Sequence, residues 1–220
     1  MTQIEQIAAF AKTIHAENTD GHGFDHIETV VALAKKILAT EPTADYDLVL
    51  ATCYLHDTYD EKICEDVAAQ KNKVAKFLSS IHYDENKAKQ IFYIVDNMSF
   101  SANLFEKKAL DINGQIVQDA DRLEAMGTAM IIRALQYGWA HNLTLYDPAI
   151  KPQTYNSKEE YHKSQKSTTI NHFYEKAFLL KNLLNTAKAR EMGEARDIIM
   201  RDFVAHFERE YDESYGFDTF

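Results

Sequence analysis

The sequence has few of the residues that break helices. Seven glycines and three prolines occur among 220 residues, and both types destabilise helix interiors. Leu, Ala, Lys, Glu and Ile fill the long stretches between them, so we expect an all-α protein. With 45% hydrophobic residues, a chain of this length can bury a sizeable core, and one domain over residues 1–220 is expected.

Cysteines and long apolar runs are also scarce. The two cysteines, Cys53 and Cys64, are not in a Cys-x-x-Cys spacing, so no disulfide framework is expected. No segment approaches the roughly 18 apolar residues of a membrane span. Residues 1–10 lack the basic region and long apolar stretch of a signal peptide. We therefore expect a cytoplasmic protein with no membrane partner.

Basic residues are outnumbered by acidic ones. Lys and Arg total 24 against 34 Asp and Glu, which leaves a net charge of −10 at pH 7. A general nucleic-acid surface needs a basic face, so no nucleic-acid partner is expected. A small nucleotide is not excluded by this charge, because a metal ion and a few lysines can supply positive charge locally.

The most informative residues, His56 and Asp57, follow a near-continuous apolar run. That run, residues 48–55, is typical of a helix buried on most of its circumference. Charged groups are costly in such a place unless something pairs with them. A divalent metal ion is one such partner, because imidazole and carboxylate are common ligands. If a metal is bound here, two further ligands are expected elsewhere in the chain.

His26 is the candidate for the first additional ligand. It lies one turn into a helix that we expect to begin at about residue 24. His22 precedes it by four residues, but Gly21 and Gly23 disfavour a helix that would place both rings on one side. The alternative for His26 alone is a surface or capping histidine.

Asp121 is the candidate for the second additional metal ligand. Asp119 and Asp121 lie in an otherwise apolar segment, and residues two apart on a helix point about 200° apart, so only one can face a given site. We choose Asp121 and expect Asp119 to pair with a basic side chain. The alternative is that this segment holds only a structural Asp–Arg pair.

Hydrophobic periodicity predicts further helices over most of the chain. The expected turn is at 111–114, and the longest irregular region is expected at 141–168. The C-terminal helices are expected to bury stripes that include Ile170, Phe173 and Phe178, and Ile199, Phe203 and Phe207. The expected helices cover about residues 3–17, 24–41, 64–80, 85–97 and 116–139, followed by two long helices at the C-terminal end.

The order of these residues resembles a known family. A histidine, then His-Asp, then an aspartate on separate helices resembles the HD-domain metal-dependent phosphohydrolases. The segments that carry the resemblance are Gly23–Val30, Tyr54–Lys62 and Gln118–Gly127. Later segments extend it to a bacterial subgroup of small cytosolic HD hydrolases, over about residues 20–210; they are Met98–Phe100, Tyr146–Pro148 and His172–Lys176.

The resemblance implies a fold and a metal site. The fold is an HD-domain helical bundle with a metal-binding core at about 20–140 and additional C-terminal helices at about 157–215. One divalent transition metal ion per chain is implied, and the mixed nitrogen and oxygen ligands suit Mn, Fe, Co, Ni or Zn. The implied ligands are His26, His56, Asp57 and Asp121.

The resemblance also implies roles for residues around the metal. Asp60 matches an acidic position that acts on the attacking water, and Lys62 matches a basic position near the substrate phosphate. The alternative for both is an ordinary solvated charge run. Arg122 follows the metal aspartate in many members, where its role is either substrate contact or structural. His172 and Lys176 either reach the phosphates or hold the C-terminal helices to the core.

The expected activity is hydrolysis of a nucleotide phosphate. The first candidate is cleavage of a nucleoside triphosphate to monophosphate and pyrophosphate, followed by a nucleoside monophosphatase and then a guanosine tetraphosphate hydrolase. A non-catalytic metal-dependent nucleotide sensor and a helical scaffold without metal are the alternatives from other classes. The subgroup often has a basic residue soon after Ser99-Phe100, which this chain lacks. A homo-oligomer is a further possibility.

Overall fold

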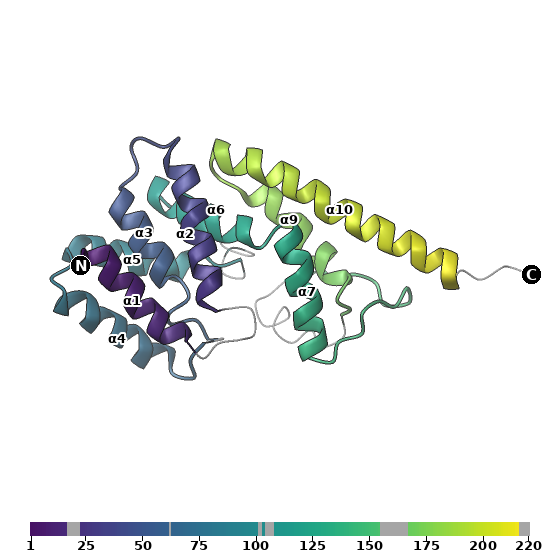
Figure 1. Cartoon of the computed structure of the whole chain (residues 1–220), viewed down its shortest axis with the longest axis horizontal. Helices are drawn as coiled ribbons and strands as arrows, with labels where there is room; N and C mark the ends of the chain where they lie inside the picture. Colours follow the sequence, from purple (N-terminus) through teal and green to yellow (C-terminus); the bar gives the residue numbers. More distant parts are fainter. Residues whose placement is uncertain (17–22, 62, 101–102, 104–107, 155–166, 216–220) are drawn as a thin grey trace, which may run out of the picture.

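The structure is a computed structural model of the chain that describes residues 1–16, 23–61, 63–100, 103, 108–154 and 167–215 (Figure 1). The all-α prediction is confirmed, since no strand occurs in these ranges. None of the helices described is long and apolar enough to cross a membrane. The elements are α1 (Gln3–His15), α2 (Phe24–Leu38), α3 (Tyr46–Leu55), α4 (Val67–Ser80), α5 (Glu85–Met98), α6 (Ile112–Glu124), α7 (Thr128–Ala140), η2 (Phe173–Ala177), α9 (Phe178–Leu180), η3 (Lys181–Leu183) and α10 (Ala187–Tyr215).

Several helices begin at a side chain that caps their first turn. Thr2 and Glu5 form a reciprocal capping box at α1. Asp45 accepts a hydrogen bond from the Leu48 N–H at α3, and Asp111 accepts one from Gly114 at α6. The predicted turn at 111–114 is therefore wrong, because Asp111 is the cap of α6 and the next residues form its first turn.

The helix predicted over 116–139 is interrupted at residues 125–127. Gly127 has a φ of 77°, a left-handed conformation that glycine adopts without a steric penalty. The chain changes direction there and continues as α7. The prediction missed the break because the apolar period on either side continues across it.

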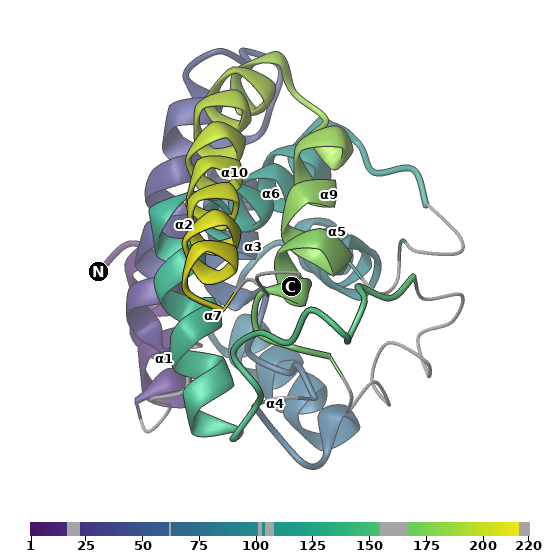
Figure 2. The same cartoon turned by 90° about the vertical axis from the view of Figure 1, so that its right-hand side faces the viewer.

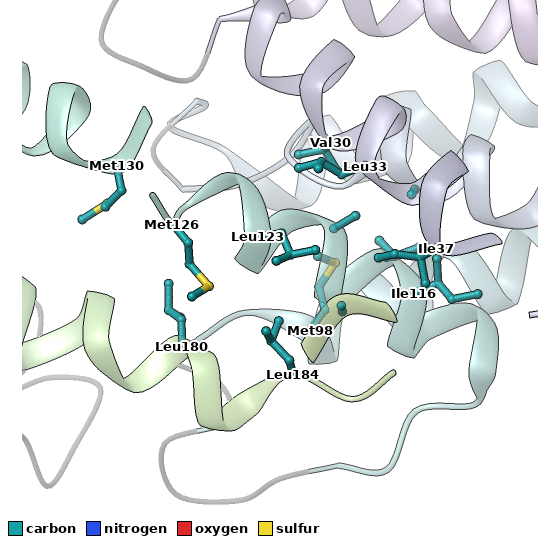
Figure 3. Packing of buried hydrophobic residues seen from close by; sticks show 14 of the residues in the cluster. Val30, Leu33, Ile37, Met98, Ile116, Leu123, Met126, Met130, Leu180 and Leu184 are labelled. Atoms are coloured by element: carbon teal, nitrogen blue, oxygen red, sulfur yellow. The ribbon is translucent and has the colours of Figure 1, made fainter. Parts of the chain in front are cut away.

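Two hydrophobic clusters surround α3. Leu48, Ala51 and Leu55 pack toward α1, α4 and α5, whereas Val49 and Cys53 belong to the cluster that α2 and α6 line. Burial on both sides explains the near-continuous apolar run and confirms the prediction of a buried helix. Figure 3 shows labelled side chains of the second cluster, which come from α2, α5, α6, the connection between α6 and α7, α7, α9 and the residue after η3.

The C-terminal helix α10 packs on α2, α6 and α7 (Figures 1 and 2). Its buried side chains include Met200 and Val204. Ile199, which we placed in the buried stripe, is 45% exposed, so that part of the prediction is wrong. The beginning of the segment predicted at about 157–215 lies outside the described residues, and its division from the core stays a prediction.

Asp119 fastens the start of α10 to α6. Its carboxylate is fully buried and accepts four hydrogen bonds, two from Asn185 and two from the Thr186 N–H and hydroxyl. Thr186 in turn accepts a hydrogen bond from the Ala189 N–H and caps the helix. Amide and hydroxyl donors, and not the basic side chain that we expected, supply these hydrogen bonds, while the charge of Asp119 still acts on the nearby Arg122.

Candidate metal centre

Two histidine rings meet where α2 begins and α3 ends. His26 lies in the first turn of α2 and His56 directly follows α3. Both side chains are buried, and their Nε2 atoms lie 3.2 Å apart. The helices position these rings because α2, α3 and α6 pack against one another.

Two carboxylates complete the cluster. Asp57 Oδ2 lies 3.4 Å from Nε2 of His26 and 3.5 Å from Nε2 of His56. Asp121 Oδ1, from α6, lies 3.7 Å from each of the same two nitrogens. The structure thus brings together all four residues that the sequence pattern selects. His26, His56 and Asp57 each offer one ligand atom, and these three atoms lie within 4.8 Å of one another, a spacing that can hold a metal ion.

The other ring nitrogens contact acceptors away from the centre. His56 Nδ1 lies 2.7 Å from the carbonyl oxygen of Cys53, which can only accept, so this nitrogen carries the proton. His26 Nδ1 lies 3.0 Å from Glu124 Oε2. Acceptors at Nδ1 favour the tautomer whose Nε2 lone pair points at a metal.

The charges of the four groups compensate one another. Burial alone would lower the pKa of His26, but the close carboxylates of Asp57 and Glu124 raise it to about 10. Burial would raise the pKa of Asp121, yet its hydrogen bond with His56 and the two ring charges lower it overall. Protons on the rings therefore balance the carboxylates, and a divalent cation at this place would replace them. The donor set and its charge fit such an ion.

Comparisons with known proteins identify the family of this chain. The HD domain family matches residues 23–126, which include all four cluster residues. A solved structure of an HD-superfamily hydrolase from Bacillus thuringiensis is 32% identical, with a TM-score of 0.74 over 96% of this chain and 97% of that one. The chain belongs to the HD-domain superfamily of hydrolases.

Two further proteins are also similar over nearly the whole chain. The uncharacterized protein YpgQ of Bacillus subtilis is 30% identical over 211 residues, which are 96% of this chain and 94% of YpgQ. A crystal structure of YpgQ in complex with ADP has a TM-score of 0.73 and 27% identity, over 94% of this chain and 97% of that one. A structure from Lactobacillus plantarum reaches a TM-score of 0.87 at 36% identity, over 96% of this chain and 97% of that one.

Asp60 lies close to the centre in sequence but outside α3. Its N–H donates to the Asp57 carbonyl over 3.2 Å, and its own carbonyl accepts from Ile63 and Cys64. Residues 57–60 therefore form a turn, instead of continuing the helix. Lys62, like His22, lies outside the described residues. The roles of Asp60 and Lys62 in this HD-domain protein stay predictions.

Three further candidates are Arg122 on α6, His172 just before η2 and Lys176 within η2. Arg122 is buried, and its Nη1 donates to the carbonyl of Leu183, which supports its structural alternative. Lys176 Nζ lies 5.7 Å from the centre of the Phe100 ring, a contact between η2 and the residues that follow α5. The His172 N–H donates to the Thr168 carbonyl. A substrate role for any of these residues stays a prediction.

Sequence reasoning missed Glu124 and Tyr59. Glu124 follows Asp121 by three residues, a spacing that puts both on one face of a helix, and this signal could have identified it. Tyr59, within the 57–60 turn, is buried and donates a hydrogen bond from its hydroxyl to Asp96 of α5. Its only signal in the sequence is an aromatic residue within a charged run.

Proposed function

We propose that this HD-domain protein is a metal-dependent phosphohydrolase that acts on nucleotides, with cleavage of a nucleoside triphosphate to monophosphate and pyrophosphate as its first candidate reaction. The observation that carries the proposal is the convergence of His26, His56, Asp57 and Asp121 on one point. The ADP bound by the related YpgQ supports a nucleotide as the ligand.

The ligand set favours a transition metal. His26 and His56 would each bind through Nε2, and Asp57 and Asp121 through a carboxylate oxygen. Two imidazoles and two carboxylates suit Mn, Fe, Co, Ni or Zn, whereas Mg prefers oxygen ligands and water. When bound, such an ion lowers the pKa of a water molecule and polarises the phosphoryl group.

The remaining chemistry belongs to the residues of the chain. Asp60 would orient the attacking water and accept its proton as the oxygen approaches phosphorus. A bond forms between that oxygen and the α-phosphorus while the bond to the oxygen bridging the β-phosphorus breaks, and pyrophosphate leaves. Lys62 would neutralise phosphate charge, which matters because a protein with a net charge of −10 repels an anionic substrate.

Products distinguish this reaction from its alternatives. A nucleoside monophosphatase would release inorganic phosphate and a nucleoside. A guanosine tetraphosphate hydrolase would release pyrophosphate from the 3′ position, but those enzymes carry an HD-x-x-ED run and this chain has Asp60 followed by Glu61. A sensor would bind one nucleotide tightly and turn over none.

A substrate panel with product identification tests the proposal. Full-length protein is incubated with each nucleoside triphosphate, monophosphate and guanosine tetraphosphate, with Mn²⁺ or with chelator, and the products are separated by ion-exchange chromatography. We expect Mn²⁺-dependent pyrophosphate release from at least one triphosphate. His56→Ala should abolish it, whereas His206→Ala, on the exposed surface of α10, should not. Turnover of every substrate at the background rate would contradict the proposal.

A further inference from the structure

Glu124 is a buried carboxylate that two partners share. Its side chain is 5% exposed, and Oε2 lies 3.0 Å from Nδ1 of His26. The same oxygen lies 2.6 Å from Nη1 of Arg133, whose side chain is 24% exposed. Burial of a charged carboxylate is costly unless it is paired and hydrogen-bonded, and here Arg133 supplies both the positive charge and a hydrogen bond.

The break between α6 and α7 makes this contact possible. Glu124 and Arg133 are nine residues apart, which in a continuous helix would separate them by about 13 Å along the axis. Instead, α6 ends at Glu124, and Gly127 takes a left-handed conformation before α7 begins at Thr128. Arg133 of α7 thereby reaches back to the last residue of α6, and α7 becomes linked to His26 through one carboxylate.

The two histidines of the centre differ in the acceptor that contacts their Nδ1 atoms. His56 Nδ1 contacts a backbone carbonyl three residues earlier, that of Cys53, and any side chain at position 53 would provide it. At His26, the acceptor that lies close to Nδ1 is the side-chain carboxylate of Glu124. A carboxylate acceptor raises the basicity of a ligating imidazole and fixes its tautomer and ring orientation. The salt bridge to Arg133 holds this carboxylate at Nδ1, away from the ligand side of the ring.

We propose that Glu124, held by Arg133, is a positioning residue for His26 and strengthens metal binding at the centre. The inference rests on the metal site proposed above, but not on the identity of the nucleotide or on turnover. It predicts that metal affinity depends on two residues that do not themselves face the metal, and that one of them belongs to α7.

The test is the affinity of full-length protein for Mn²⁺, measured by titration against a competing chelator. Glu124→Gln keeps the size of the side chain but removes its charge, and we expect binding about 10–100-fold weaker than that of the wild type. Arg133→Met should weaken binding in the same direction by a smaller factor. The double variant should lose less than the product of the two single losses, because both act through one contact.

Asp197 supplies a matched control. It is a buried carboxylate bound by Arg201 over 2.8 Å, on α10. Asp197→Asn should lower the thermal stability of the metal-free protein and leave Mn²⁺ affinity within twofold of wild type. Stability measured without metal thus separates general damage from a specific effect on His26.

Each outcome decides the inference. Wild-type affinity in Glu124→Gln, or equal weakening in Asp197→Asn, would overturn it. If Glu124→Gln does not fold, unchanged affinity in Arg133→Met would overturn it instead. Tight Mn²⁺ binding without hydrolysis of any nucleotide would overturn the proposed function alone, whereas a wild type that binds no metal would overturn both.

Discussion

Asp119 and Asp121 lie two residues apart on α6 and face different parts of the molecule. Asp121 Oδ1 lies 3.7 Å from Nε2 of both His26 and His56. Asp119 accepts hydrogen bonds from Asn185 and Thr186 at the start of α10. One helix therefore contributes to the candidate metal centre on one side and fastens the C-terminal helix on the other.

Asp119→Ala tests the second of these functions. The substitution leaves the buried donors of Thr186 and the partly buried donors of Asn185 without their acceptor, which we expect to cost about 2–4 kcal/mol. For a chain of this size the melting temperature should fall by about 5–15 °C. Differential scanning calorimetry measures the change. The folded variant should still bind metal as the wild type does, and an unchanged melting temperature would show that this contact contributes nothing to stability.

Removal of metal should lower the stability of the wild type. A ligand that binds only the folded state at 100 times its dissociation constant contributes about 2.7 kcal/mol, or about 5–10 °C at this size. Thermal unfolding with Mn²⁺ and with chelator measures the difference. His56→Ala should show no difference between the two conditions, while His206→Ala should respond as the wild type does.

Asp60→Asn should separate metal binding from catalysis. The amide cannot accept a proton, so we expect turnover to fall by about 10²–10⁴-fold with metal affinity retained. Steady-state rates on the best nucleotide of the panel provide the measurement. The neighbouring Glu61→Gln, at an exposed position, is the control and should keep the wild-type rate. A rate near wild type in Asp60→Asn would remove Asp60 from the mechanism.

Asp45 gives a pH dependence away from the metal centre. Burial alone would raise the pKa of this α3 cap, but the Lys87 ammonium, 2.7 Å away, and the Leu48 N–H lower it overall. A folded pKa below the unfolded value contributes stability above about pH 4, which is lost as the pH falls through the folded pKa. Asp45→Asn keeps the cap and loses the charge, so wild type should be the more stable at pH 6, with the difference disappearing toward pH 2. An equal difference at both pH values in urea denaturation would contradict this assignment.

Most of the candidate centre could be predicted from the sequence. The apolar run Leu48–Leu55 predicts a helix that is buried on both sides. His56 and Asp57 at its end need partners, because burying unpaired charged groups is costly. Helix geometry predicted that only one of Asp119 and Asp121 can face a given site, and the family resemblance indicated Asp121. The structure confirms that the two carboxylates face different ways.

Features that depend on packing between distant segments could not be predicted. The apolar period runs through the break at Gly127, and a single glycine does not reveal that its φ is 77°. Ile199 fits a helical stripe, yet the face of α10 that packs on the core is centred on Met200 and Val204. The pairing of Glu124 with Arg133 follows from the same unpredicted break.

Metal content measured by elemental analysis tests the central claim most directly. Wild type, His56→Ala and His206→Ala are purified without chelator and analysed beside one another. The account predicts one divalent transition metal ion per chain in the wild type and in His206→Ala, and none in His56→Ala. A wild type without metal, or a His56→Ala variant with the same metal content, would contradict it.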